Sequence, residues 1–212
     1  RFGPNIADWP KMEPLPENLL LWVVSVIRDP VTTTDELIPS GETASYRSNP
    51  LKLAEFTLAR KDPRYVPRAK AIQKLESQRA LLRAGGASTD DLSDALAPFW
   101  TEGKPTPGEF GRFITDTRLG SVIFAAKPGD GSAREQAASC QKVLGGQANI
   151  ALEYATKRYR SNLINWGMLP FTIGKEAADR LAVDDIIFIP EIRRAVQEGV
   201  ETIPAFLVRD GK

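Results

Sequence analysis

The chain has 212 residues, a formal net charge of +1, one cysteine and no histidine. Its 42% hydrophobic and 26% charged residues are typical of a globular protein of one or two domains. The near-neutral charge argues against a nucleic-acid partner. The absence of histidine excludes a Ser-His-Asp triad, and a single cysteine excludes an internal disulfide framework and a cysteine-only metal cage within this chain.

The first expected elements are a lead-in and a buried strand. Residues 1–18 are rich in proline, asparagine and acidic residues, which predicts an extended lead-in or linker. Residues 19–27 are apolar and β-branched and predict a strand. This apolar run is too short to cross a bilayer, so we expect no membrane partner and a cytoplasmic protein. A long polar loop, residues 31–50, follows; loops of this length are often functional.

A helical region is expected next. Residues 50–61 and 88–99 predict short helices, and residues 67–86 predict a longer one that ends at a pair of glycines. On this longer helix the spacing of the apolar residues places four side chains on one face: Ile72, Leu75, Leu81 and Leu82. Residues 101–113 are rich in proline and glycine and predict a connection without regular structure.

The second half of the chain alternates strand and helix patterns. Strands are expected at residues 119–127, 147–155 and 168–173, with helices at 131–146 and 156–167 between them. Residues 183–212 predict further strands, with a helix near 190–199. The alternation predicts an α/β fold. The chain starts without methionine and stops at an Asp-Gly turn signal after a strand, so we expect a fragment of a longer protein.

Ser132 stands at the expected start of a helix, in the stretch "AKPGDGSAREQAAS". The S-x-x-E pattern that it forms with Glu135 predicts a capping box. Gly129 and Gly131 allow a ligand to approach the backbone, and the helix amides together with Arg134 favour a carboxylate and an ionised serine oxygen. The spacing of a phosphate-binding loop is absent. These residues alone leave two interpretations open, a helix cap and a carboxylate site.

Two separated stretches resemble the C-terminal swivelling domain of the aconitase family. "GDGSAREQAASCQKVLGG" followed by "YRSNLINWGMLPF" is similar to the family's G-x-G-S-S-R-E-H run and its later S-N-L-x-x-x-G-[MLI]-L-P segment. "TTDELIPSGETASYR" is similar to the family's T-D-H-I-S-x-A-G segment. The resemblance covers roughly residues 25–175 and looks closer to bacterial aconitase-like hydratases than to the mitochondrial type. It implies a swivelling β/β/α-type domain over residues 19–212, with a central mixed sheet or barrel and flanking helices.

The resemblance also implies roles for individual residues. Ser132 falls on the family's catalytic serine, whose alkoxide removes the proton next to a substrate carboxylate, so it would be both cap and base. Arg134 and Arg47 fall on arginines that bind substrate carboxylates, and Asp35 falls on a supporting acidic residue. The small residues of the loop would shape it and line the substrate: Gly129, Gly131 and Ala133.

Four positions depart from the family pattern. Ala133 replaces a second serine and removes a hydroxyl that could stabilise an oxyanion. Gln136 and Glu36 replace histidines, and Lys157 replaces an arginine. These changes leave proton abstraction feasible and put citrate itself in doubt as the substrate.

The resemblance further implies a [4Fe-4S] cluster, which needs three cysteine thiolates. This chain has one cysteine, Cys140, which is most simply a small core residue. The cluster is therefore expected on other domains of the same polypeptide or on a large subunit, with no metal held by this chain. The leading hypothesis is the C-terminal domain of a hydro-lyase acting on a hydroxy di- or tricarboxylic acid and inactive by itself. The alternatives are the small subunit of an isopropylmalate-type dehydratase and a non-catalytic carboxylate- or RNA-binding module.

Overall fold

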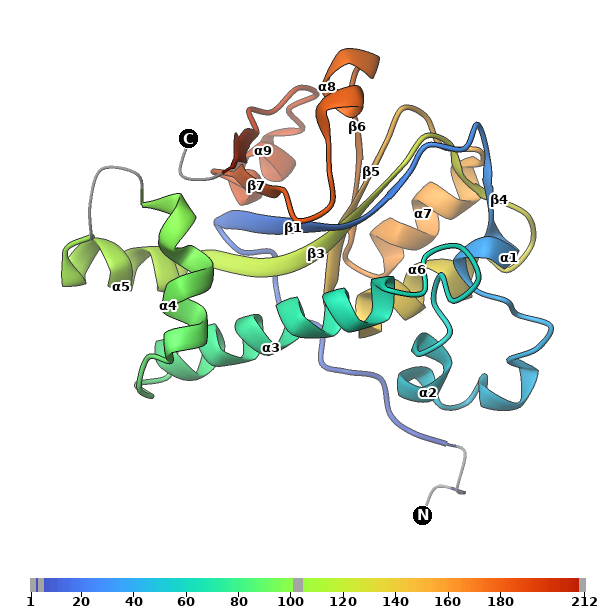
Figure 1. Cartoon of the computed structure of the whole chain (residues 1–212), viewed down its shortest axis with the longest axis horizontal. Coiled ribbons are helices and arrows are strands. Elements are labelled where there is room, and N and C mark those ends of the chain that lie inside the picture. The colour runs from blue at the N-terminus through green and yellow to red at the C-terminus, as the bar shows by residue number, and fades with distance from the viewer. Residues whose placement is uncertain (1–2, 4–5, 101–104, 210–212) are drawn as a thin grey trace.

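The computed structural model describes residues 3, 6–100 and 105–209. Its centre is a six-stranded mixed sheet in the order β6-β5-β3-β1-β7-β8 (Figure 1). The first four strands in that order run parallel, and β7 and β8 are antiparallel to their neighbours. The strands are β1 (Asn18–Ile27), β3 (Thr117–Ala125), β5 (Gly146–Ala151), β6 (Leu169–Thr172), β7 (Ile186–Ile189) and β8 (Phe206–Val208). The expected α/β fold with a central mixed sheet is confirmed.

The two faces of β1 lie in two separate hydrophobic clusters, because successive side chains of a strand point to opposite faces. Leu20, Trp22 and Val24 pack with residues of the helices between β1 and β6. Leu19, Leu21 and Val23 pack in the other cluster with residues from α8 (Lys175–Arg180) and α9 (Ile192–Glu198). This burial on both faces explains why the strand is an almost uninterrupted apolar run.

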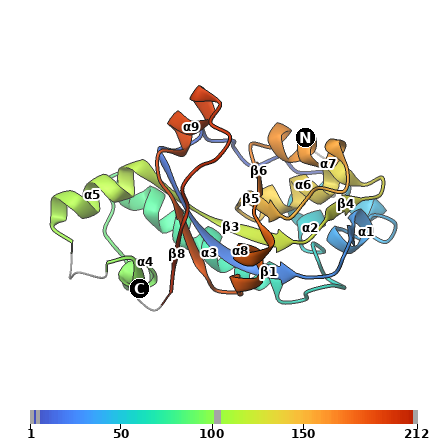
Figure 2. The ribbon, with the colours of Figure 1, turned by 90° about the horizontal axis from the view of Figure 1, so that it is seen from above.

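The first face is covered by helices that lie far apart in the sequence. They are α2 (Pro50–Ala54), α3 (Tyr65–Arg83), α4 (Asp90–Leu96), α5 (Pro107–Asp116), α6 (Arg134–Val143) and α7 (Lys157–Asn165), with 3-10 turns at Ala44–Tyr46 and Ala97–Phe99. Figures 1 and 2 show α4 and α5 at one end of the molecule and α6 and α7 at the other. No helix in the described ranges is both long and apolar enough to cross a membrane.

Two helix predictions are wrong. The expected connection at 101–113 contains the start of α5, in which Thr106 caps the helix, Pro107 occupies its first turn and Glu109 completes a capping box. Residues 101–104 of that connection, and the Asp-Gly turn signal at 210–211, lie outside the described residues. Leu81 does not share the buried face of α3, since its side chain is 66% exposed; this helix packs through Tyr65, Ala69 and Ile72.

A small second sheet joins two loops that leave the same end of the main sheet. The strand β2 (Thr32–Thr33) follows β1 and leads into α1 (Thr34–Leu37), while β4 (Pro128–Asp130) follows β3. Because β1 and β3 are parallel neighbours, both loops emerge at the carboxyl ends of their strands. In parallel sheets this edge is where ligand sites usually lie.

Candidate functional site

The loop after β3 is held against the loop after β1. Thr32 pairs with Pro128 and Thr33 with Asp130 in the small parallel sheet. Gly131 has a φ of +129°, and a β-carbon there would lie 2.2 Å from Oγ1 of Thr34. A residue with a side chain would therefore push the two loops apart. The close approach brings the serine loop and the 31–50 loop together, as the resemblance implies.

The expected helix cap at Ser132 is wrong. Helix α6 begins at Arg134, and Ala133 occupies the N-cap position with no side chain capping the helix. Glu135 does not reach back to a cap amide, because its Oε1 accepts a hydrogen bond of 3.1 Å from Nε1 of Trp166. The first amides of α6 are consequently left without a side-chain acceptor, which is the arrangement that attracts an anion to a helix start.

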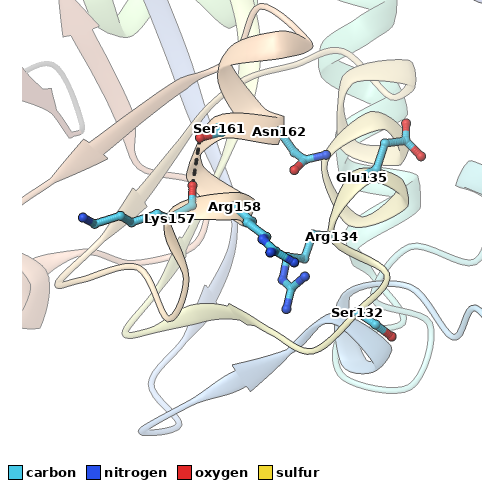
Figure 3. Close-up of a pocket in the computed structure, with 7 residues that line it drawn as sticks. All are labelled: Ser132, Arg134, Glu135, Lys157, Arg158, Ser161 and Asn162. Atoms are coloured by element: carbon cyan, nitrogen blue, oxygen red, sulfur yellow. Dashed lines mark hydrogen bonds between the residues drawn. The ribbon is translucent and has the colours of Figure 1, made fainter.

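An open pocket of about 300 Å³ lies between the start of α6 and the first turns of α7 (Figure 3). Figure 3 shows the side chains of Arg134 and Arg158 extending toward each other from these two helices. Within the described ranges, neither arginine nor Lys157 has an acidic partner within ion-pair distance. The pocket is lined by Ser132, Arg134, Glu135, Lys157, Arg158, Ser161 and Asn162.

The side chain of Arg134 also carries an unsatisfied polar atom. Its Nε is buried and has no hydrogen-bond partner among the residues that the structure describes. A buried donor of this kind costs free energy unless something accepts from it, and a carboxylate is the acceptor that a guanidinium fork fits best. The pocket therefore presents two neighbouring guanidinium groups, one from each helix, while the Lys157 ammonium and the Glu135 carboxylate point away from them (Figure 3); this arrangement suits an anionic ligand.

Ser132 lies at the rim of this pocket. Its side chain is exposed, and Figure 3 shows its hydroxyl turned away from the two guanidinium groups. In the described part of the chain no group hydrogen-bonds to this hydroxyl. An exposed serine side chain changes rotamer within nanoseconds, so the hydroxyl can swing toward a bound ligand.

Beneath the pocket a buried hydrogen-bond triangle ties α6 and α7 to β5. The Tyr159 hydroxyl donates to Oδ1 of Asn149 at 2.8 Å, and Nε2 of Gln141 donates to the same hydroxyl at 2.9 Å. Nδ2 of Asn149 closes the triangle on Oε1 of Gln141 at 2.8 Å. Burial raises the pKa of Tyr159 far above its usual value, so the hydroxyl stays protonated and serves as structure.

Gly129 links this foundation to the serine loop. Its φ is +96°, and a β-carbon there would lie 2.3 Å from the Tyr159 ring. The Gly129 carbonyl also accepts a hydrogen bond of 3.1 Å from Oγ1 of Thr156, which in turn caps α7. The glycine is thus required for the contact between the loop and the helix that form the two walls of the pocket.

The structure does not bring Arg47 or Asp35 into the pocket. Asp35 is exposed and forms an ion pair with Arg60, whose Nη1 lies 3.2 Å from its Oδ2. Arg47 is exposed in the loop just after the 3-10 turn and does not line the pocket. In the neighbouring capping box, Glu36 bonds to Thr33, and its pKa is lowered by the Thr33 backbone amide.

Sequence reasoning missed part of the α7 wall. It singled out Lys157 only as a departure from the family pattern and did not consider Arg158, Ser161 or Asn162. The four residues stand at helical spacing in "KRYRSN", with pairs one turn apart, so they share one side of α7. This spacing, in a segment already thought to return to the site, was the signal that could have found them.

The described residues do not fit an iron–sulfur cluster. Cys140 is buried in the main core cluster, and burial raises the pKa of its thiol to about 12, far from the thiolate that a metal requires. In the ranges that the structure covers, no three histidine, cysteine, aspartate or glutamate side chains gather as metal ligands would. The expectation that Cys140 is a core residue is confirmed.

Comparison with known proteins identifies a matching family model and similar proteins, among them the following two. Residues 114–176 match the model of the aconitase C-terminal domain. The mitochondrial homocitrate dehydratase of Saccharomyces cerevisiae is 30% identical over 112 residues, which are 52% of this chain and 14% of that protein. The solved structure of a 3-isopropylmalate dehydratase from Methanocaldococcus jannaschii aligns over 91% of this chain and 83% of that chain, with 19% identity and a TM-score of 0.47. The matched segment begins within α5 and ends within α8, so it contains the serine loop and both walls of the pocket. The part of the chain that forms the serine loop and both walls of the pocket therefore belongs to an aconitase-family C-terminal domain.

Proposed function

We propose that this chain supplies the carboxylate-binding and proton-transfer side of an aconitase-type hydro-lyase. The whole enzyme would interconvert a hydroxy di- or tricarboxylic acid, such as citrate or isocitrate, and the corresponding unsaturated acid. The observation that carries this proposal is the pair of neighbouring arginines, Arg134 and Arg158, without ion-pair partners in the described structure, at a pocket inside the segment that matches the aconitase C-terminal domain. The name of the yeast relative, a homocitrate dehydratase, supports the same class of reaction.

The lining of the pocket supports a binding role for residues of both helices. Arg134 and Arg158 would hold one substrate carboxylate between their guanidinium groups, with the uncapped amides of α6 directed at the same anion. Lys157 would add a third positive charge at the rim. Arg47 would bind a second carboxylate from the neighbouring loop, with Asp35 as a supporting residue.

Ser132 would act as the base. Transfer of a proton from the carbon next to the bound carboxylate to the serine alkoxide leaves an electron pair that forms the carbon–carbon double bond as hydroxide departs. The helix start and Arg134 both favour the ionised serine oxygen. Gly129, Gly131 and Ala133 would keep the loop narrow enough for the substrate to approach its backbone.

The iron–sulfur chemistry of the reaction would be supplied from outside this chain. Since the described residues do not fit a [4Fe-4S] cluster, the cluster that the family implies would be held by other domains of the same polypeptide or by a large subunit. The chain spans only 14% of the yeast relative, which leaves room for such domains in a protein of that kind. Co-purification with a separate cysteine-bearing chain would favour the small-subunit arrangement.

Anion binding tests the pocket directly. Titration calorimetry of the full chain with citrate should show saturable binding, and Arg134→Gln should weaken it at least about tenfold, because a charge-assisted bidentate pair is lost. Arg64→Gln removes the same charge from an exposed residue that precedes α3 and does not line the pocket, so it should leave citrate binding unchanged. Equal citrate affinity in the wild type and Arg134→Gln would overturn the proposal, and salt-sensitive binding of RNA in place of citrate would favour the non-catalytic module.

Activity tests the role of Ser132. In the polypeptide or complex that joins this domain to a cluster-bearing part, the unsaturated acid is followed by its absorbance. Ser132→Ala should lower kcat by a factor of about a hundred or more while KM changes little, because the serine contributes to proton transfer and not to binding. A kcat that survives this change would remove Ser132 from the reaction.

A further inference from the structure

The acidic side chain at the pocket is turned away from the cations that surround it. Glu135 directly follows Arg134 and lines the same pocket, yet no ion pair between its carboxylate and Arg134 or Arg158 occurs in the described structure. Figure 3 shows the Glu135 carboxylate pointing away from both guanidinium groups. Its oxygen accepts the hydrogen bond from Nε1 of Trp166 instead, at 3.1 Å.

This orientation matters for an anion site. A carboxylate free to rotate beside two guanidinium groups would pair with them, neutralise part of their charge and compete with an incoming anion. The indole N–H of Trp166 gives the Glu135 carboxylate a different hydrogen-bond donor, since an indole nitrogen can only donate. The carboxylate then no longer competes with an anion for the two arginines.

Trp166 is itself held in place from two sides. It ends α7 in a Schellman motif: Gly167 has a φ of +65°, and the amides of Met168 and Gly167 donate to the carbonyls of Leu163 and Ile164 at 2.9 and 2.8 Å. On its other side the Trp9 ring of the lead-in packs against it, with 4.4 Å between the ring centroids. The indole that holds Glu135 is therefore fixed by both a helix end and the N-terminal segment.

We propose that Trp166 is a positioning residue that holds the Glu135 carboxylate out of the pocket and so keeps Arg134 and Arg158 available to an anion. The inference rests on the proposed function of the pocket. It adds that Glu135 would otherwise compete with an anion for the two arginines. Trp166 prevents this by holding the carboxylate, and Trp9 supports the indole.

Chemical modification of the arginines tests the proposal without relying on turnover. Phenylglyoxal modifies accessible guanidinium groups, and peptide mass spectrometry gives the rate at Arg134 and Arg158 separately. In the full chain, Trp166→Phe keeps the ring but removes the donor. The Arg134 and Arg158 rates should then fall about two- to fivefold, which is the effect of one partly exposed ion pair. Glu135→Gln placed in the Trp166→Phe chain should restore both rates.

The controls separate positioning from damage. The rate at Arg47 should stay the same in all variants, and Trp100→Phe, at the opposite end of the molecule, should alter neither pocket arginine. Unchanged rates in Trp166→Phe, or a fall that Glu135→Gln does not rescue, would overturn the inference. Citrate in the same reaction should protect both arginines of the wild type. Rates that respond to Trp166→Phe without any citrate protection would support the inference while removing the proposed function.

Discussion

Gly129 lies directly against the ring of Tyr159, so closely that a β-carbon on the glycine would lie 2.3 Å from Cγ of that ring. The tyrosine is fully buried and held by the hydrogen-bond triangle beneath the pocket. Because Gly129 belongs to β4 and Tyr159 to α7, this one contact sets the separation between the serine loop and the α7 wall. The width of the candidate site is thus determined by a glycine that has no part in its chemistry.

Gly129→Ala should destabilise the chain in two ways. The φ of +96° strains any residue with a β-carbon, and the added methyl would overlap the Tyr159 ring. Gly85→Ala is the matched control, since Gly85 has a φ of +93° with nothing within 4 Å of an added β-carbon. Urea unfolding should show a loss of about 1–2 kcal/mol for the control, and a loss about 1–3 kcal/mol larger for Gly129→Ala. Equal losses would mean that the contact with Tyr159 relaxes freely.

Tyr159→Phe should destabilise the fold by about 1–3 kcal/mol, since Oδ1 of Asn149 loses its donor and Nε2 of Gln141 loses one of its acceptors inside the core. Tyr46→Phe provides the comparison, because the Tyr46 hydroxyl makes no hydrogen bond in the described structure and its loss should be within about 0.5 kcal/mol of neutral. The measurement is the free energy of unfolding from urea titration at pH 7. A Tyr159→Phe chain as stable as the wild type would show that water replaces the lost hydroxyl.

Lys142 should make stability depend on pH in the alkaline range. Burial, with a smaller contribution from the nearby Arg118, lowers the pKa of Lys142 from 10.5 to about 8. Between these two values the unfolded chain binds the proton and the folded chain does not, so the free energy of unfolding rises with pH from about 8 to 10.5. Below pH 8 both states are protonated, and the folded state bears the cost of the half-buried charge.

Lys142→Met checks this assignment. The substitution removes the half-buried charge, so the stability of the variant relative to the wild type should be most favourable near pH 7. That advantage should shrink as the pH passes 8 and the wild-type lysine loses its proton. Urea unfolding at pH 7, 8.5 and 10 measures the difference. A difference that stays constant across this range would place the Lys142 ammonium in water.

The Cys140 thiol should be unreactive in the folded chain. It is buried, and its pKa is raised to about 12, so almost no thiolate is exposed near neutral pH. The reaction with a chromogenic disulfide reagent should therefore proceed at the rate at which the core opens. The unfolded chain in urea should release one equivalent at once, in agreement with the single cysteine. Prompt stoichiometric reaction of the native chain would contradict the buried placement.

Long apolar runs in the sequence predicted the core strands well, whereas the start of helix α5 was missed. The strands β1 and β3 each contain a run of apolar residues, Leu19–Val24 and Val122–Ala125, because both strands are buried on both faces. Helix α5 was hidden by a composition rich in proline and glycine. Its proline sits in the first turn, where the missing amide costs nothing, and an added β-carbon at Gly108 or Gly111 would meet nothing within 4 Å, so these glycines face open space.

The site was predictable only where a local sequence motif contains it. The motif around Ser132 located the loop and Arg134, but the capping box was wrong because Glu135 finds its donor on Trp166, 31 residues away. No local pattern contains that partner. Motif spacing alone predicted Arg47 and Asp35 at the site, and in this structure neither residue lines the pocket.

The pairing of β1 with β3 has a consequence for how the chain folds. Its register joins Asn18 to Thr117, so 99 positions of sequence must be closed into a loop before the two central strands meet. Closing such a loop costs conformational entropy before any contact compensates for it, and folds that depend on distant pairings form slowly. During synthesis on the ribosome, β1 is exposed with apolar side chains on both faces until β3 has been synthesised. The serine loop follows the carboxyl end of β3, so it can adopt its structure only late in folding.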